Sequence, residues 1–214
     1  MSGAALTRRD SQQTRQVKTA VKDENRVRDR RQQLIDAAIK VFMEKGFHTT
    51  TVRDIGKAAG LTQGTIYNYV RSTDDILYLV CDHVVTAYQD AVRQSLASLK
   101  KEEDALPAIL RAIATTMCEY QDHILLIYHE SHALNRDSLH SVLARVEEFV
   151  DFIKGAMVAA GVQADETEMH VWANIATFLP TMIGMRRWLL RRVQSQEEVI
   201  EALVAFMLKG FGRS

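Results

Sequence analysis

Residues 60–70, with the sequence GLTQGTIYNYV, gather hydrogen-bonding side chains and contain no charged residue. Gln63 can pair bidentately with adenine, and the Asn68 amide can read adenine or bridge to a phosphate. Thr65 offers a hydroxyl and a methyl group to a base or a phosphate. Gly64 lets the backbone approach a partner closely. These residue types at this spacing favour contact with the major groove of DNA.

Two tyrosines of the same segment suit a different contact. The hydroxyls of Tyr67 and Tyr69 can donate to phosphate oxygens and orient a helix on DNA without reading its sequence. The alternative for each ring is a half-buried position in a small helical core. Ile66 is assigned to that core.

Two short helices must position these side chains. The first is expected over residues 52–59, with Thr51 as its N-cap and Gly60 at its end. The second is expected over residues 62–69, with Thr62 as its N-cap. A longer helix starts near Arg28 and precedes both. Two short helices joined by a tight glycine-containing turn predict a helix-turn-helix unit.

The formal net charge of zero conceals an uneven distribution. Residues 1–71 hold 14 Lys and Arg against 7 Asp and Glu, whereas residues 72–214 hold 13 against 20. A basic first part on an acidic second part is the asymmetry expected when only the first meets a polyanion. The flanking arginines are therefore expected to attract the phosphates, so residues 60–70 can bind DNA without charged side chains of their own.

The remaining sequence predicts an all-α protein with three parts. Residues 1–27 are expected to form a flexible basic arm, either a solvated tail or a DNA-contacting arm. Residues 28–73 are expected to form the helix-turn-helix domain, and residues 74–214 a larger helical domain. Helical periodicity predicts helices near 74–99, 105–120, 122–134, 137–160, 165–192 and 196–211.

Residues 51–70, TVRDIGKAAGLTQGTIYNYV, resemble the DNA-binding domain of TetR-family transcriptional regulators. They follow an Arg-rich start and a helix end at Lys45, Gly46 and Phe47, and the resemblance covers residues 28–80. It implies a homodimer that binds double-stranded DNA with a palindromic sequence. The candidate DNA contacts are Thr51, Arg53, Thr62, Gln63, Gly64, Thr65, Tyr67, Asn68, Tyr69 and Arg71.

Three positions depart from the family pattern. Gly56 replaces a usual alanine, which costs the helix up to about 1 kcal/mol but leaves room for close packing. Val70 replaces a phenylalanine that usually fills the small core. Thr73 stands where the family often has a lysine that meets a phosphate, and Arg71 is the candidate substitute.

The resemblance also implies that the second domain binds a small-molecule effector and forms the dimer through its last two helices. Pro180 should kink the first of these helices, and freed backbone groups often line a cavity. The candidate effector contacts are Tyr88, Tyr120, Tyr128, His129, His132, Trp172, Phe178, Met182, Arg186 and Arg187.

Residues 184–192, GMRRWLLRR, contain four arginines, which suggest an effector that carries phosphate groups. Guanidinium groups bind phosphate bidentately, although solvated charge near a helix end is the simpler explanation. Together with residues 128–134, this segment is similar to TetR-type regulators that sense acyl-CoA thioesters. The expected function is a repressor that a small hydrophobic or acyl-CoA-type effector releases from DNA, with no other cofactor.

Two other functions stay open. His129, Glu130 and His132 form H-E-x-H, which suggests a metal-dependent enzyme but lacks the spacing of the H-E-x-x-H zinc motif. We therefore expect no catalytic or metal-binding residues. The second alternative is a DNA binder without an effector.

The longest apolar runs are far shorter than a membrane span, and the first residues lack the apolar core of a signal peptide. We therefore expect a cytoplasmic protein without a membrane partner. Cys81 and Cys118 are isolated in the sequence and are expected to be small core residues.

Overall fold

The computed structural model describes residues 17–101, 105–190, 192 and 195–212. Within these ranges the regular structure is helical and no strand occurs, which confirms the all-α prediction. The elements are α1 (Glu24–Lys45), α2 (Val52–Ala58), α3 (Gln63–Ile66), α4 (Thr73–Ala97), α5 (Ala105–Glu119), α6 (Gln121–Glu130), the 3-10 helix η2 (Ser131–Ala133), α7 (Arg136–Ala159), α8 (Glu166–Phe178), α9 (Thr181–Met185), α10 (Arg187–Leu190) and α11 (Gln196–Gly210).

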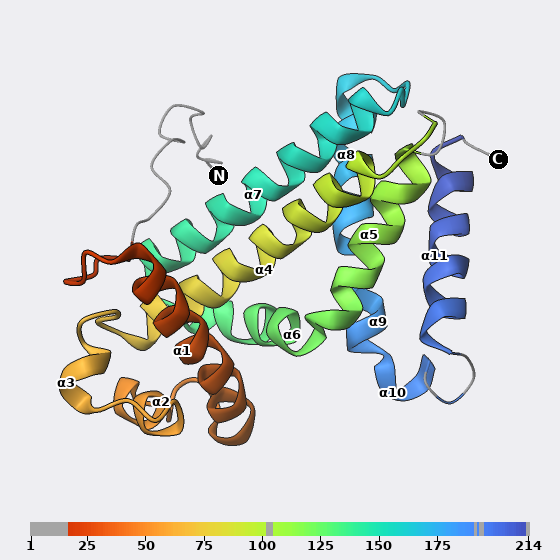
Figure 1. The fold of residues 1–214 in the computed structure, drawn as a ribbon. Helices are drawn as coiled ribbons and strands as arrows, with labels where there is room; N and C mark the ends of the chain where they lie inside the picture. Colours follow the sequence, from red (N-terminus) through yellow and green to blue (C-terminus); the bar gives the residue numbers. More distant parts are fainter. Residues whose placement is uncertain (1–16, 102–104, 191, 193–194, 213–214) are drawn as a thin grey trace, which may run out of the picture.

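The helices form a small head and a larger body (Figure 1). The head consists of α1, α2 and α3 at one end of the molecule. Helix α4 leaves the head, contacts α1, and packs along its length on α5 and α7. Helix α6 also contacts α1, so movement in the body would reach the head through α4 and α6.

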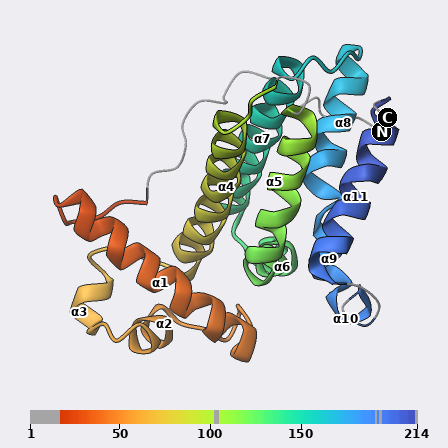
Figure 2. The same ribbon diagram turned by 45° about the vertical axis from the view of Figure 1, so that its right-hand side comes forward.

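The body is organised around α5. Figure 2 shows α4, α7, α8 and α11 running alongside it, and α5 contacts each of them as well as α9. Ile109, Ile113 and Met117 on α5 are fully buried. Cys81 and Cys118 are also buried as free thiols, as predicted, and burial raises the pKa of the Cys81 thiol to about 12.

The end of α1 confirms the prediction made for Gly46. This residue has φ of 80°, a conformation that glycine adopts readily, and its N–H donates to the carbonyl of Phe42. The ring of Phe47 is buried and packs back on Phe42 with 5.2 Å between the ring centroids. The helix therefore stops where the sequence indicates.

The predicted start of α1 was too late. Helix α1 begins at Glu24, where the Asp23 carboxylate accepts a hydrogen bond from the N–H of Arg26 at 3.1 Å. Val17 and Val27 are buried, so residues 17–27 belong to the head and not to a flexible arm. The rest of the predicted arm, residues 1–16, lies outside the described residues.

The predicted helix over residues 165–192 is wrong. The chain forms α8, α9 and α10 instead, because Pro180 has no N–H to continue a helix and occupies the N-cap of α9. A second break at Arg186 separates α9 from α10. Leu179 and Pro180 keep right-handed helical backbone angles, so Pro180 removes a hydrogen bond of the helix, as expected, without turning the backbone out of the helical region.

Close packing of α9 against α5 and α6 depends on Gly184. A Cβ atom at this position would lie 2.6 Å from Cε of Met117 and 3.4 Å from Cβ of Gln121. This close approach therefore occurs between helices of one chain.

We expect Gly184→Leu to lower the free energy of unfolding by about 1–3 kcal/mol, because the added carbons push α9 away from α5 and α6. Gly155→Ala is the matched control, since a Cβ atom there meets nothing within 4 Å on α7. The control should raise stability by up to about 1 kcal/mol through helix propensity. Urea unfolding of both variants tests this, and equal effects would contradict the packing role.

Candidate nucleic-acid interface and effector site

Each of the two short helices of the head begins at a threonine. Thr51 is the N-cap of α2, as predicted, and forms a capping box with Asp54, in which the Thr51 hydroxyl also donates to the Asp54 carboxylate at 2.7 Å. This bond and the backbone N–H of Thr51 lower the pKa of Asp54 to about 2. At the start of α3, the Thr62 hydroxyl accepts from the N–H of Thr65 and lies 2.8 Å from its hydroxyl.

A glycine allows α2 and α3 to pack closely. Ile66 of α3 is fully buried, as predicted, and a Cβ atom on Gly56 would lie 2.8 Å from its Cδ1. Gly56 therefore leaves the room for close packing that its departure from the family pattern suggested. Gly60 ends α2 with φ of 68° and turns the chain toward α3.

The outer face of α3 is polar. Gln63, Gly64 and Asn68 are exposed, and the Tyr67 side chain is 50% exposed. The regular helix is only four residues long, shorter than predicted, and hydrogen-bonded turns continue it to Val70. A short helix with a projecting amide, a phenol and no charge can enter a DNA groove and pair with base edges.

The sequence-based prediction for Tyr69 was wrong. Its side chain is 1% exposed and lies in the core of the head, next to the fully buried Val70. Tyr67, two residues earlier in the same hydrogen-bonded turn, is half exposed, so the two tyrosines have different surroundings. Tyr69 therefore cannot reach a phosphate, and the core alternative is correct for it.

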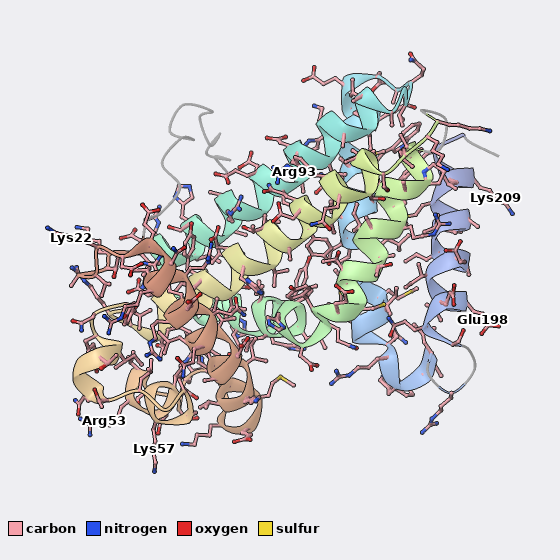
Figure 3. All side chains as sticks on the ribbon, in the orientation of Figure 1. Lys22, Arg53, Lys57, Arg93, Glu198 and Lys209 are labelled. Atoms are coloured by element: carbon pink, nitrogen blue, oxygen red, sulfur yellow. The ribbon has the colours of Figure 1, made fainter. Side chains whose placement is uncertain are left out.

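The other predicted DNA contacts lie around α3. Arg53 is exposed on α2, and Figure 3 shows it projecting from the head together with Lys57. Arg71 is exposed, and its backbone N–H donates to the Asp75 carboxylate at 2.9 Å. Thr51 is exposed with its hydroxyl already bonded to Asp54. Their contacts with DNA stay predictions.

A cluster that the sequence analysis missed lies where the head meets the body. The rings of His83 (α4), Tyr120 and His123 (α6) pack with centroids 5.2–6.2 Å apart, and the Asp36 carboxylate of α1 acts on both histidines. Nδ1 of His123 is buried without a hydrogen-bond partner among the described residues. Tyr120 and His123 lie three residues apart, but Asp36 and His83 come from distant parts of the chain, so no spacing pattern indicates the whole cluster.

This cluster makes stability depend on pH. Burial, and then the neighbouring His83, lower the pKa of His123 to about 4, whereas an unfolded histidine has a pKa of about 6.5. Below pH 6.5 the unfolded chain binds a proton that the folded chain excludes. The stabilisation that comes from keeping His123 neutral is therefore fully present above pH 6.5, and it is lost as the pH falls toward 4.

We expect the wild-type protein to lose about 1–2 kcal/mol of unfolding free energy between pH 7 and pH 4.5 through His123, which is partly exposed. His123→Gln should remove this part of the loss, and His170→Gln, at an exposed position on α8, serves as the control. Urea unfolding at several pH values measures the difference. Parallel pH profiles for the two variants would refute the role of His123.

The predicted effector contacts do not form one site. Tyr88 is buried, stacks on Phe149 and donates to Sδ of Met117 at 3.5 Å. Trp172 stacks on Phe211 of the segment after α11, with 5.3 Å between the centroids. Tyr120 belongs to the histidine cluster. These three side chains therefore have structural packing partners in different parts of the body.

Other predicted contacts lie at the surface of the body. Tyr128 packs edge-on against Phe178, with 5.8 Å between the ring centroids, and both rings are about half exposed. The remaining side chains of this group are exposed: His129, His132, Met182 and Arg186. Among the described residues, no group of three or more His, Cys, Asp or Glu side chains is arranged to hold a metal ion.

A small cleft lies between α5, α6 and the last helices. Its cavity volume is about 30 Å³, which is room for a few water molecules and far below the roughly 300–1,000 Å³ of a typical ligand pocket, so it is too small for an effector. Arg187 borders it and forms an ion pair with Asp122. The cleft is lined by Cys118, Gln121, Ile183, Arg187, Leu190, Gln196 and Val199.

The outer surface of the last helices is rich in exposed apolar side chains. On α8 they recur at the helical spacing of Val171, Ile175 and Phe178, and on α11 Phe206 is 66% exposed. Met182, Met185, Trp188 and Leu189 add to them between the two helices. Such a surface is unusual on a monomer and is typical of a protein interface. None of the helices in the described ranges has the length and apolarity to cross a membrane.

Comparison with known proteins matches the head to one family. Residues 34–78 match the model of "Bacterial regulatory proteins, tetR family", and the resemblance found in the sequence is thereby confirmed. The chain is 31% identical over 128 residues to the HTH-type transcriptional regulator HbdR of Aromatoleum sp. (strain CIB), covering 60% of this chain and 56% of HbdR. The chain thus spans about half the length of the curated relatives it matches. The relatives are regulators and not enzymes, as expected.

Solved structures extend the similarity to the whole fold. A regulatory protein of the tetR family from Rhodococcus RHA1 superposes with a TM-score of 0.69 at 17% identity, covering 86% of this chain and 97% of that one. AibR, solved in complex with isovaleryl coenzyme A and operator DNA, superposes with a TM-score of 0.64 at 17% identity, covering 83% and 97%. The predicted architecture, a helix-turn-helix domain followed by a larger helical domain, is confirmed.

Proposed function

We propose that this chain, whose residues 34–78 form a tetR-family N-terminal domain, is a transcriptional regulator that binds a palindromic operator as a dimer. The observation that carries the proposal is the outer face of α3, where Gln63, Tyr67 and Asn68 are exposed on a helix held against α2 at Gly56. The excess of Lys and Arg in residues 1–71 supports the same partner.

Within this proposal some side chains of the head contact bases and others contact phosphates. Gln63 and Asn68 read base edges, with adenine as the favoured base. Tyr67, Arg53 and Arg71 contact phosphates and set the position of the head on the duplex. Thr51, Thr62, Gly64 and Thr65 lie at the starts of α2 and α3, where backbone N–H groups favour phosphate.

The dimer is formed by the apolar surface of α8 and α11. Val171, Ile175, Phe178 and Phe206 are exposed there in one chain, and a second copy would cover them. A two-fold axis at this surface leaves both heads free at the other end of the body. Two recognition helices about 34–36 Å apart then meet successive major grooves of a palindrome.

The effector is proposed to be a small hydrophobic molecule or an acyl-CoA thioester. Two observations support this class: Arg187 borders a cleft that Ile183, Leu190 and Val199 also line, and AibR, which has the same fold, was solved with isovaleryl coenzyme A. The cleft holds about 30 Å³, so binding must separate α9 and α10 from α5 and α6. Helix α4 then carries the movement to the head, and the dimer no longer fits the operator.

Selection of duplexes from random-sequence DNA by the full-length protein tests DNA binding. We expect a palindrome to be enriched and bound far more tightly than a scrambled duplex at 150 mM salt. If no sequence is enriched, the proposal that this protein binds a palindromic operator is wrong.

A second experiment tests the effector. Isovaleryl-CoA, free coenzyme A and isovalerate are added to the protein in a thermal-shift assay and to its complex with the selected duplex. An acyl-CoA effector raises Tm and releases the duplex, whereas the two fragments do so weakly. If no compound changes either quantity while the duplex stays bound, the acyl-CoA class is rejected and a DNA binder without this effector is favoured.

A further inference from the structure

The segment before α1 packs against the residues that follow α3, the proposed recognition helix. We call residues 17–21 the strap. The hydroxyl of Thr19 donates to the carbonyl of Asn68 at 2.9 Å, and the N–H of Ala20 donates to the same carbonyl at 3.0 Å. In Figure 1 the strap lies beside the connection from α3 to α4. Two donors of the strap therefore bind the carbonyl of Asn68, which lies just after α3.

The strap is itself fixed to the head. Val17 is buried, and the Arg31 guanidinium of α1 donates to its carbonyl. The Thr19 hydroxyl also accepts from the N–H of Val21 at 3.2 Å, which closes a local turn, and Val21 packs on the hydrophobic core. The strap thus connects α1 to the end of α3 through bonds at both of its ends.

The recognition helix needs such support because it is short. Four residues are far fewer than a helix requires to be stable alone, and the last carbonyls of a helix lack helical partners. Asn68 is exposed, and its carbonyl points back to the strap while its side chain is free for DNA. The direction of Tyr67 and Asn68 therefore depends on what holds this carbonyl.

We infer that the strap is a positioning element for operator recognition, with Thr19 as the residue that locks the C-terminal turn of α3 in the orientation that DNA requires. This inference rests on the proposed DNA binding. Thr19 acts through Asn68, so the strap affects the fit between the helix and base edges. Phosphate attraction comes from other residues, and loss of the Thr19 bond leaves it unchanged.

The test compares Thr19→Val, which has the shape of threonine without the hydroxyl, with Thr19→Ser, which keeps the hydroxyl. Full-length proteins are titrated with the palindrome selected by the wild-type protein and with a scrambled duplex, from 50 to 300 mM salt. Thr19→Val should lower affinity for the palindrome about fivefold, with unchanged affinity for scrambled DNA and an unchanged salt slope. Thr19→Ser should bind both duplexes within about twofold of wild type.

Amide hydrogen exchange gives a second reading that does not require DNA. The N–H groups of Tyr69 and Val70 bond to the carbonyl of Ile66, and their exchange should become faster in Thr19→Val but not in Thr19→Ser. Amides of α5 and α7 should be unchanged in both variants.

The outcomes separate the two proposals. Wild-type protein without preference for any duplex contradicts the proposed function. A wild-type protein that selects a palindrome, together with a Thr19→Val variant that binds it equally well, overturns the strap inference. Equal loss of affinity for both duplexes would also overturn it, because that pattern indicates a phosphate contact.

Discussion

Gln63→Ala is expected to lower affinity for the operator about tenfold to a hundredfold and to relax the base preference at one position of each half-site. The amide is exposed in the first turn of α3, where it can donate to and accept from one adenine. A bidentate pair of this kind contributes about 1–3 kcal/mol of discrimination. Alanine removes the pair and keeps the helix, because Thr62 provides the N-cap.

Titration of the selected palindrome and of its single-base variants measures this effect. Tyr67→Phe is the comparison, since it removes a hydroxyl proposed to contact phosphate. It should weaken binding to every duplex by a similar factor. If Gln63→Ala binds all base variants with the same ranking as wild type, Gln63 does not read a base.

Ile175→Glu combined with Phe206→Glu is expected to convert the dimer into a monomer and to lower operator affinity more than a hundredfold. The two side chains are 40% and 66% exposed on α8 and α11, so each carboxylate is solvated in the monomer and would be buried in the dimer. Burying unpaired charges at an interface costs several kcal/mol. A monomer engages only one half-site and loses the gain from linked binding.

Sedimentation measures the oligomeric state, and titration of the palindrome measures affinity. Leu143→Glu is the matched control, because Leu143 is 56% exposed on α7, outside the proposed interface. The control should remain dimeric and bind normally. A double variant that sediments as a dimer would exclude the surface of α8 and α11 as the interface.

Local sequence signals were reliable where one short segment decides the structure. Thr51 and Thr62 begin α2 and α3, and Gly46 and Gly60 end α1 and α2, because caps and left-handed turns depend on residues within one helical turn. Ile66 is core for the same reason, since it lies between cap and turn on the inner face of α3.

Predictions failed where a residue's partner lies elsewhere in the chain. Tyr69 resembles Tyr67 in the sequence, yet it is buried because the turn after Ile66 directs it into the head. Residues 17–21, VKTAV, show no helical periodicity, and only their bonds to Asn68 and Arg31 reveal the strap. The effector candidates were chosen by residue type, which carries no information about their distance from one another.

The sequence by itself determined the all-α class, the helix-turn-helix unit and the family of the head, because these follow from periodicity, capping residues and a dense motif within about fifty residues. Only the tertiary structure decided which side chains face outward and that Asp36, His83 and His123 meet. The physical reason is the distance along the sequence over which each interaction acts. Caps and turns act over three or four residues, whereas burial and a shifted histidine pKa depend on groups that folding brings together from distant parts of the chain.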